Sequence, residues 1–185
     1  MSEETPVRSL FVFGGARSGK SGYAQRLAEG CGLAPVLIAT AEAHDDEMRA
    51  RIARHAAARA AFWRLVEEPL ALAQALEREA SPGAVVLVDC ATLWLSNLML
   101  REEDPEAATA GLRAAIARLS GPAIFVSNEV GCGLVPGTAL GRAFRDAQGR
   151  LNQSLAEACD AAVELRAGLP LQLKPAAAPR LRFAL

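Results

Sequence analysis

The sequence lacks several features that would each assign it to a particular class of protein. It has no apolar stretch long enough to cross a membrane. Its cysteines form no C-x-x-C pair, so neither a zinc knuckle nor a disulfide framework is indicated. The formal net charge is only −1, which provides no electrostatic argument for nucleic acid or an anionic membrane as the main partner. The first residues are polar and acidic, so we expect no signal peptide and a cytoplasmic protein.

What is present is the apolar content of one globular domain. Hydrophobic residues make up 51% of the 185 residues, enough for a single well-formed core. Short apolar runs predict strands at 10–13, 35–39, 84–89, 123–127 and 161–165. Helical patterns cover 21–29, 43–61, 69–80 (with Pro69 in the first turn), 92–101, 105–119 and 140–158. Buried strands that alternate with helices predict an α/β fold, with a mostly parallel sheet covered by helices on both faces.

The most informative motif is Gly-Gly-Ala-Arg-Ser-Gly-Lys-Ser, which directly follows the first predicted strand and opens a helix. This is the G-x-x-x-x-G-K-[ST] pattern of a phosphate-binding loop (P-loop), whose glycines let backbone N–H groups point at phosphate oxygens. The lysine supplies charge to the β- and γ-phosphates, and the following hydroxyl is a ligand for Mg²⁺. The alternative is a glycine-rich turn that binds nothing. The motif predicts nucleotide contacts from Gly14, Gly15, Ala16, Arg17, Ser18, Gly19, Lys20 and Ser21.

Asp89 ends the predicted strand 84–89. Alone, an aspartate at a strand end is usually a helix cap or a turn residue. Beside a P-loop, a carboxylate at the C-terminal end of a buried parallel strand predicts a second Mg²⁺ ligand, together with Ser21.

The segment from His44 to Glu68 is rich in arginine and contains both histidines of the chain. In a helix, Glu47, Arg51, His55 and Arg59 would fall four residues apart on one stripe. Neighbouring arginines favour a neutral imidazole, and a neutral imidazole can attack phosphorus. From the spacing alone, however, a solvated helix with Glu–Arg pairs is the better interpretation.

A third group of polar residues follows the predicted strand 123–127. Asn128 and Glu129 begin a loop that contains two glycines and a proline. Because open α/β sheets bind ligands at the carboxyl ends of their strands, these two side chains are candidate substrate contacts. A purely structural loop is the alternative.

Together these segments resemble the bifunctional adenosylcobinamide kinase / adenosylcobinamide-phosphate guanylyltransferase family of cobalamin biosynthesis. The matching segments lie at 14–21, 39–41, 45–48, 51–55, 63, 67–69, 127–136, 144–146 and 149–153. The resemblance implies a P-loop NTPase fold of the RecA-like type in a single domain, 8–174, followed by a tail, 175–185. It also implies a homotrimer, for which the arginine-rich stretch 142–150 is a candidate interface.

The resemblance further implies two reactions at one nucleotide site. The γ-phosphoryl group of ATP or GTP passes to adenosylcobinamide, with Lys20, Ser21, Asp89 and Mg²⁺ as the working parts. GMP from GTP then passes through a covalent GMP-histidine on His55 to adenosylcobinamide phosphate, which gives adenosylcobinamide-GDP. By the same match, Thr40, Ala41, Glu42, Arg59, Glu67 and Asp89 surround the guanine nucleotide.

Two other interpretations are compatible with the P-loop. A P-loop kinase for a different small molecule would have no use for His55. A nucleotide-binding regulator or ATPase subunit would have no small-molecule acceptor.

Overall fold

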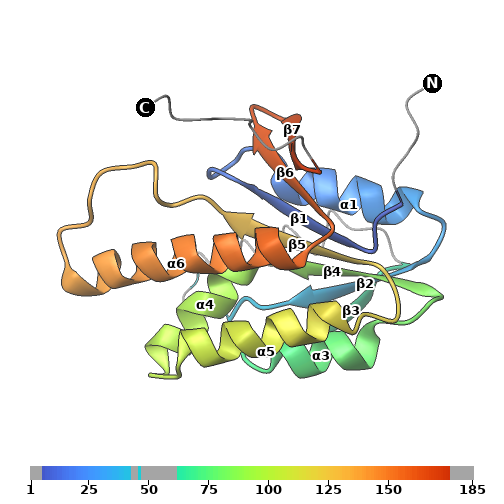
Figure 1. The fold of residues 1–185 in the computed structure, drawn as a ribbon, viewed down its shortest axis with the longest axis horizontal. Coiled ribbons are helices and arrows are strands. Elements are labelled where there is room, and N and C mark those ends of the chain that lie inside the picture. Colours follow the sequence, from blue (N-terminus) through green and yellow to red (C-terminus); the bar gives the residue numbers. More distant parts are fainter. Residues whose placement is uncertain (1–5, 43–45, 47–61, 176–185) are drawn as a thin grey trace, which may run out of the picture.

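The computed structural model describes residues 6–42, 46 and 62–175. Within them the strands form one seven-stranded sheet in the order β3-β2-β4-β5-β1-β6-β7 (Figure 1). The strands are β1 (Ser9–Gly14), β2 (Ala34–Ala39), β3 (Arg64–Glu67), β4 (Ala84–Asp89), β5 (Ala123–Asn128), β6 (Ala161–Arg166) and β7 (Leu169–Lys174). Strands β1 to β6 pair in parallel, and β7 is antiparallel to β6. The parallel strands therefore present their carboxyl ends along one edge of the sheet.

Helices pack on both faces of this sheet, as Figure 1 shows. Helix α1 (Lys20–Gly30) buries Ala24 and Ala28 in an apolar cluster on one face. The helices α3 (Leu72–Glu79), α4 (Ala91–Leu100), α5 (Pro105–Ala117) and α6 (Ala139–Ala158) contribute to a larger cluster on the other face. Trp94 and Phe125 are among the largest fully buried side chains. The predicted α/β fold class is thus confirmed, and the sheet is mostly parallel.

The strand and helix positions agree closely with the apolar pattern. All five predicted strands are present, each within one residue of its predicted ends. Helix α5 begins where its sequence indicates, because Asp104 accepts hydrogen bonds from the Glu106 and Ala107 amides and Pro105 occupies the first turn.

The start of α3 differs from the prediction. The helix begins at Leu72 rather than at Pro69. The Glu68 carboxylate accepts hydrogen bonds from the Leu70 and Ala71 amides at 3.1 and 2.8 Å, which holds this stretch in a turn. Pro69 therefore lies in the turn before the helix. The predicted helix 43–61 lies outside the described residues.

Two strands at opposite edges of the sheet were not predicted. Strand β3 is four residues long and mostly exposed, so it carries no apolar run. Strand β7 contains Pro170, and a proline within an apolar run argues against a central strand. At the edge of the sheet Pro170 is tolerated, because a strand there has one side without a pairing partner.

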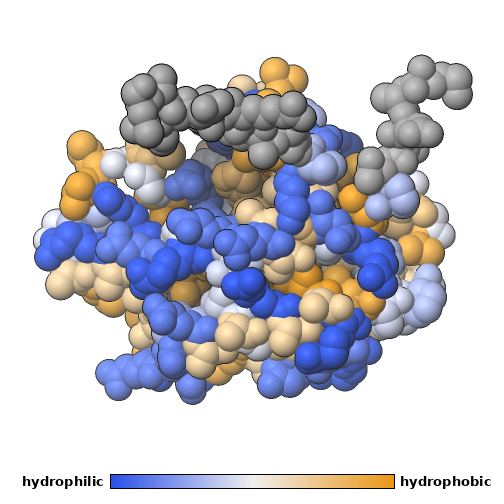
Figure 2. Space-filling model, viewed as in Figure 1, coloured by the Kyte–Doolittle hydropathy of each residue, from blue (hydrophilic) through white to orange (hydrophobic). Residues whose placement is uncertain are grey.

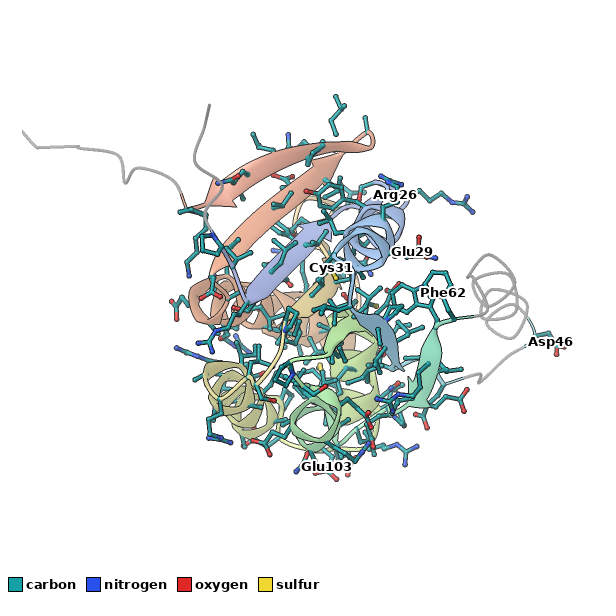
Figure 3. The ribbon with its side chains drawn as sticks, turned by 90° about the vertical axis from the view of Figure 1, so that its right-hand side faces the viewer. Arg26, Glu29, Cys31, Asp46, Phe62 and Glu103 are labelled. Carbon is teal, nitrogen blue, oxygen red and sulfur yellow. The ribbon has the colours of Figure 1, made fainter. Side chains whose placement is uncertain are left out.

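A side-chain hydrogen bond connects the end of α1 to the residue just before β3. Figure 3 shows Glu29 and Cys31 at the end of α1 and Phe62 just before β3. The Trp63 indole donates a hydrogen bond to Glu29 Oε1 at 2.9 Å. This bond, and then one from Gln25, lower the pKa of Glu29. This hydrogen bond holds Trp63, just before β3, against the end of α1.

Candidate functional site

The P-loop connects the end of β1 to the start of α1 at the carboxyl edge of the sheet. A Cβ atom on Gly14 would lie 2.5 Å from the Leu165 carbonyl oxygen, so only glycine fits at this position. Gly19 has a φ of 95° and directly precedes α1. The left-handed backbone at Gly19 turns the chain into the helix, whose N-terminus then faces the loop. The loop has the local geometry that its sequence predicts.

Lys20 lies in the first turn of α1 and is buried. Its Nζ donates a hydrogen bond to the Gly15 carbonyl at 3.1 Å, so the ammonium group lies over the loop. A buried ammonium group beside a helix N-terminus makes this a strongly anion-attracting position.

The turn between β6 and β7 supports the P-loop from the side. The Gly168 amide donates a hydrogen bond to the Ser18 carbonyl at 2.9 Å. A Cβ on Gly19 would lie 3.2 Å from the Gly168 Cα, so the two segments are in close contact. Sequence reasoning missed this contact. The sequence feature that could have indicated the turn is the pair Ala167-Gly168. In the structure both residues have a positive φ.

Asp89 ends β4 on the same edge. The strand register places Ala39 opposite both Glu67 and Asp89, so the ends of β3, β2 and β4 lie in one row. Cys90 directly follows Asp89 and is buried. Burial, and then the Asp89 carboxylate, raise the pKa of Cys90 to about 11, while the Lys20 ammonium acts in the opposite direction.

Thr40 links the ends of β2 and β4. Its hydroxyl donates to the Cys90 carbonyl at 2.7 Å and accepts from the Cys90 amide at 3.0 Å. The Thr40 carbonyl accepts from the Asn97 amide group. Beyond it, Glu42 forms an ion pair with Arg101 at 2.6 Å. The Thr40 hydroxyl thus holds the backbone next to Asp89.

Asn128 is the last residue of β5 and Glu129 follows it, between the P-loop and the end of β4. The register places Asn128 opposite Gly14. The Glu129 amide donates a hydrogen bond to the Gly14 carbonyl at 3.0 Å. The carboxyl edge therefore carries Asp89 at the end of β4 and Asn128 at the end of β5, beside the P-loop and Lys20 in the first turn of α1.

A family model described as cobinamide kinase / cobinamide phosphate guanyltransferase matches residues 10–173. The chain belongs to this family.

Two curated relatives extend the family match over almost their whole length. The chain is 50% identical over 166 residues to the bifunctional adenosylcobalamin biosynthesis protein CobP of Pseudomonas aeruginosa, covering 88% of this chain and 95% of that protein. It is 37% identical over 180 residues to the bifunctional adenosylcobalamin biosynthesis protein CobU of Escherichia coli, covering 89% and 99% respectively.

Solved structures support the fold alone. A type III secretion system ATPase of pathogenic bacteria superposes with a TM-score of 0.54 at 11% identity, and the match covers 85% of this chain and 50% of that one. A Pyrococcus horikoshii protein, PH0250, gives a TM-score of 0.51 at 9% identity, covering 89% of this chain and 85% of that one.

Several predicted site residues of this family member lie outside the described residues. These are His55 and Arg59; the chain's other histidine, His44, for which no site role was predicted, also lies outside the described residues. Glu42 lies beyond the carboxyl end of β2, whereas Phe62 precedes the amino end of β3; of the residues between these two, only Asp46 is described. Within the described ranges, no group of three or more His, Cys, Asp or Glu side chains could hold a metal ion. In the same ranges, no helix is long and apolar enough to span a membrane.

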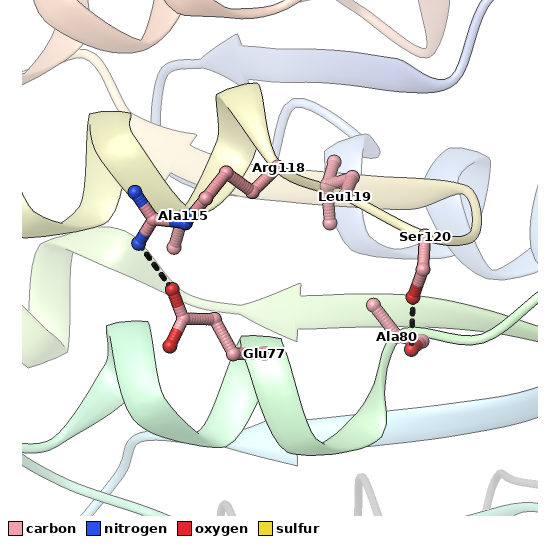
Figure 4. Close-up of a pocket in the computed structure, with 6 residues that line it drawn as sticks. All are labelled: Glu77, Ala80, Ala115, Arg118, Leu119 and Ser120. Carbon is pink, nitrogen blue, oxygen red and sulfur yellow. Dashed lines mark hydrogen bonds and ion pairs between the residues drawn. The ribbon is translucent and has the colours of Figure 1, made fainter.

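A cavity of about 370 Å³ lies elsewhere on the molecule (Figure 4). Its lining comes from the last turns of α3 and α5 and includes the Glu77–Arg118 ion pair and Ser120. These residues precede β4 and β5, so the cavity lies toward the amino edge of the sheet. It is separate from the P-loop and plays no part in the candidate site.

Proposed function

We propose that the chain phosphorylates adenosylcobinamide with ATP or GTP and then transfers GMP from GTP to adenosylcobinamide phosphate, which gives adenosylcobinamide-GDP. The observation that carries this proposal is the P-loop, with buried Lys20, at the same sheet edge as Asp89 and Asn128, in a member of the cobinamide kinase family. The relatives named as bifunctional biosynthetic proteins support the assignment of both steps to one chain.

In the kinase step the chain acts by binding and orienting the triphosphate. Lys20 and the N-terminus of α1 attract the β- and γ-phosphates. The Ser18 hydroxyl is buried and, among the described residues, makes no hydrogen bond. A buried polar group without a partner costs free energy, and a phosphate oxygen in the loop would supply that partner.

The oxygen atoms of Ser21 and Asp89 fit Mg²⁺. Hydroxyl and carboxylate oxygens are ligands for this hard cation, and Asp89 ends β4 at the sheet edge that carries the P-loop. Bound there, Mg²⁺ would neutralise charge on the β- and γ-phosphates. Asn128 and Glu129 are the proposed contacts for the acceptor.

In the second step, we propose His55 as the nucleophile. Its imidazole nitrogen attacks the α-phosphorus of GTP, the bond to the bridging oxygen breaks, and pyrophosphate leaves. A phosphate oxygen of adenosylcobinamide phosphate then attacks the same phosphorus, and the P–N bond breaks. Thr40, Ala41, Glu42, Arg59 and Glu67 are the proposed nucleotide contacts around this centre. Two displacements replace one more difficult one.

The first test is incubation with α-labelled GTP and Mg²⁺, followed by denaturing electrophoresis. We expect a labelled band that is acid-labile and alkali-stable, as a phosphoramidate is. His55→Ala should abolish this label and guanylyl transfer while nucleotide binding persists. His44→Ala is the matched control and should keep the label. A label lost in His44→Ala but kept in His55→Ala would overturn the assignment of the nucleophile.

We also propose a homotrimer, in line with the resemblance. Exposed apolar side chains on the segment after β5 support self-association, because Leu134 and Val135 are 96% and 66% exposed. Figure 2 shows apolar side chains at the end of the molecule where this segment projects. Arg142, by contrast, donates hydrogen bonds to the Pro136 and Gly137 carbonyls and braces its own loop. Light scattering coupled to size exclusion measures the assembly, and a monomer at micromolar concentration would contradict the proposal.

A further inference from the structure

A chain of buried polar side chains lies directly behind Asn128. It consists of Thr92 on α4, Ser127 on β5, and Gln148 and Asn152 on α6. Ser127 and Gln148 are fully buried, and the other two are at most 8% exposed. Polar groups in such a position cost free energy unless they are hydrogen-bonded. The arrangement of their bonds therefore shows what the group does.

The hydrogen bonds that these side chains make determine which group donates and which accepts in each contact. Gln148 Nε2 donates to Ser127 Oγ and to Asn152 Oδ1, both at 2.9 Å. Ser127 Oγ donates its single hydrogen to Asn152 Oδ1 at 2.8 Å. The Thr92 hydroxyl, 3.2 Å from Ser127 Oγ, must then be the donor in that contact.

Both ends of this polar chain reach the backbone of Asn128. The Asn128 amide donates to Thr92 Oγ1 at 2.7 Å. Asn152 Nδ2 donates to the Asn128 carbonyl at 3.1 Å. Both backbone groups of Asn128 are thus held by side chains, while its own side-chain amide makes no hydrogen bond within the part of the chain that the structure describes.

The clamped residue lies between the two ends of the candidate site. The next amide, that of Glu129, donates to the Gly14 carbonyl of the P-loop. On the other side, Thr92 lies in the first turn of α4, immediately after Asp89 and Cys90. A shift of Asn128 would therefore change its distance from both phosphate-binding and metal-binding groups.

We infer that Thr92, Ser127, Gln148 and Asn152 are positioning residues that hold the Asn128–Glu129 segment in register with the P-loop for acceptor transfer. This inference rests on the proposed function for its catalytic consequence, but not for its structural claim. The hydroxyl of Thr92 is the decisive group, because it is the partner of the Asn128 amide.

The test compares Thr92→Val, which removes the hydroxyl but keeps the shape, with Thr92→Ser, which keeps the hydroxyl. Thr109→Val is the matched control, since the Thr109 hydroxyl bonds only the Pro105 carbonyl within α5. Amide hydrogen exchange of a peptide spanning 128–134 is measured on the full chain without substrate. We expect exchange about tenfold faster in Thr92→Val, with Thr92→Ser and Thr109→Val near wild type. Unchanged exchange in Thr92→Val would overturn the inference.

The catalytic readout is kcat and KM for phosphoryl transfer to adenosylcobinamide, with nucleotide affinity and thermal midpoint measured in parallel. Thr92→Val should lower kcat roughly tenfold with little change in nucleotide affinity, and Thr92→Ser should restore it. Equal losses of kcat and thermal midpoint in Thr92→Val and Thr92→Ser would show a packing role and overturn the inference. An inactive wild-type chain would instead contradict the proposed function, and the exchange experiment would still decide the structural claim.

A second pair of variants keeps the inference testable if Thr92→Val does not fold. Asn152→Asp retains an oxygen toward Ser127 but replaces the donor that faces the Asn128 carbonyl. Gln153→Glu makes the same change of charge on the exposed face of α6. Faster exchange at 128–134 in Asn152→Asp alone supports the inference, and equal exchange in both variants overturns it.

Discussion

At the scale of single residues, position decides what a side chain does. The chain has two lysines, and each ammonium group binds backbone carbonyl oxygens. Lys20 lies at the start of a helix, where cations are unfavourable and anions are attracted, and we propose that its charge binds the nucleotide. The ammonium group of Lys174, a residue of β7, lies at the end of α6, where its charge is favourable in the folded protein itself.

Replacement of Lys20 by alanine should impair both proposed transfers, because both need the triphosphate held in the same loop. The lost contact is charge-assisted and is worth on the order of 1.5–3 kcal/mol of nucleotide binding free energy. Isothermal titration with ATP and GTP measures this loss, and the two half-reactions are assayed on the same preparation. Full kinase activity in a folded Lys20→Ala protein would contradict the P-loop assignment.

At the scale of elements, a side chain of β7 caps the C-terminal end of α6. The last turn of α6 contains no basic residue, although its free carbonyls carry partial negative charge. Lys174 of β7 donates to the carbonyls of Ala156, Glu157 and Cys159 at 3.0, 2.9 and 2.5 Å. The edge strand therefore supplies the cap that the helix sequence lacks.

Lys174→Ala should lower the free energy of unfolding by about 1–2 kcal/mol, because two carbonyls of α6 and that of the following Cys159 lose a charged partner. Urea denaturation measures the change. Gln172→Ala is the control on the same strand, since its side chain bonds only the Pro175 carbonyl, and it should have a much smaller effect. A Lys174→Ala protein with wild-type stability would show that this contact does not cap α6.

At the scale of the whole molecule, Asp160 joins the start of β1 to the junction between α6 and β6. Its carboxylate accepts hydrogen bonds from the Arg8 and Ser9 amides at 2.8 and 3.0 Å. Burial raises the pKa of Asp160, but these amide bonds outweigh burial, so the pKa is lowered. A carboxyl with a lowered pKa in the folded state stabilises the protein above its unfolded pKa, and that stabilisation is lost as pH falls through the folded value.

The protein should therefore lose stability on acidification from about pH 5 downward, because protonation of Asp160 weakens the hydrogen bonds that its carboxylate accepts from the Arg8 and Ser9 amides. Asp160→Asn should be less stable at neutral pH and should show a shallower loss toward acid. Denaturation midpoints between neutral pH and pH 3 give the comparison. Asp146→Asn changes a carboxylate on α6 that is 63% exposed and should follow the wild-type profile. Parallel acid profiles for Asp160→Asn and wild type would rule out this role.

Local signals account for the parts that were predicted correctly. The P-loop is a turn between adjacent elements, so its residue order alone specifies the backbone shape. The buried strands appear as apolar runs, and β4 was located to the residue. The predicted start of the helix at Pro105 also depends on near neighbours, because Asp104 caps it. The position of Asp89 at the ligand edge followed from the strand that it ends.

Contacts between distant segments could not be predicted in this way, because apolar periodicity shows that a strand is buried but not which strand lies beside it. Only the tertiary structure decided that the Gly168 turn supports the P-loop and that the Thr40 hydroxyl holds Cys90. The edge strands β3 and β7 were missed for a related reason, since an exposed strand is defined by its pairing partner. The sequence by itself determined the phosphate-binding loop and the fold class. The tertiary structure decided how the polar side chains around Asn128 are arranged, because they come from α4, β5 and α6, which only folding brings together.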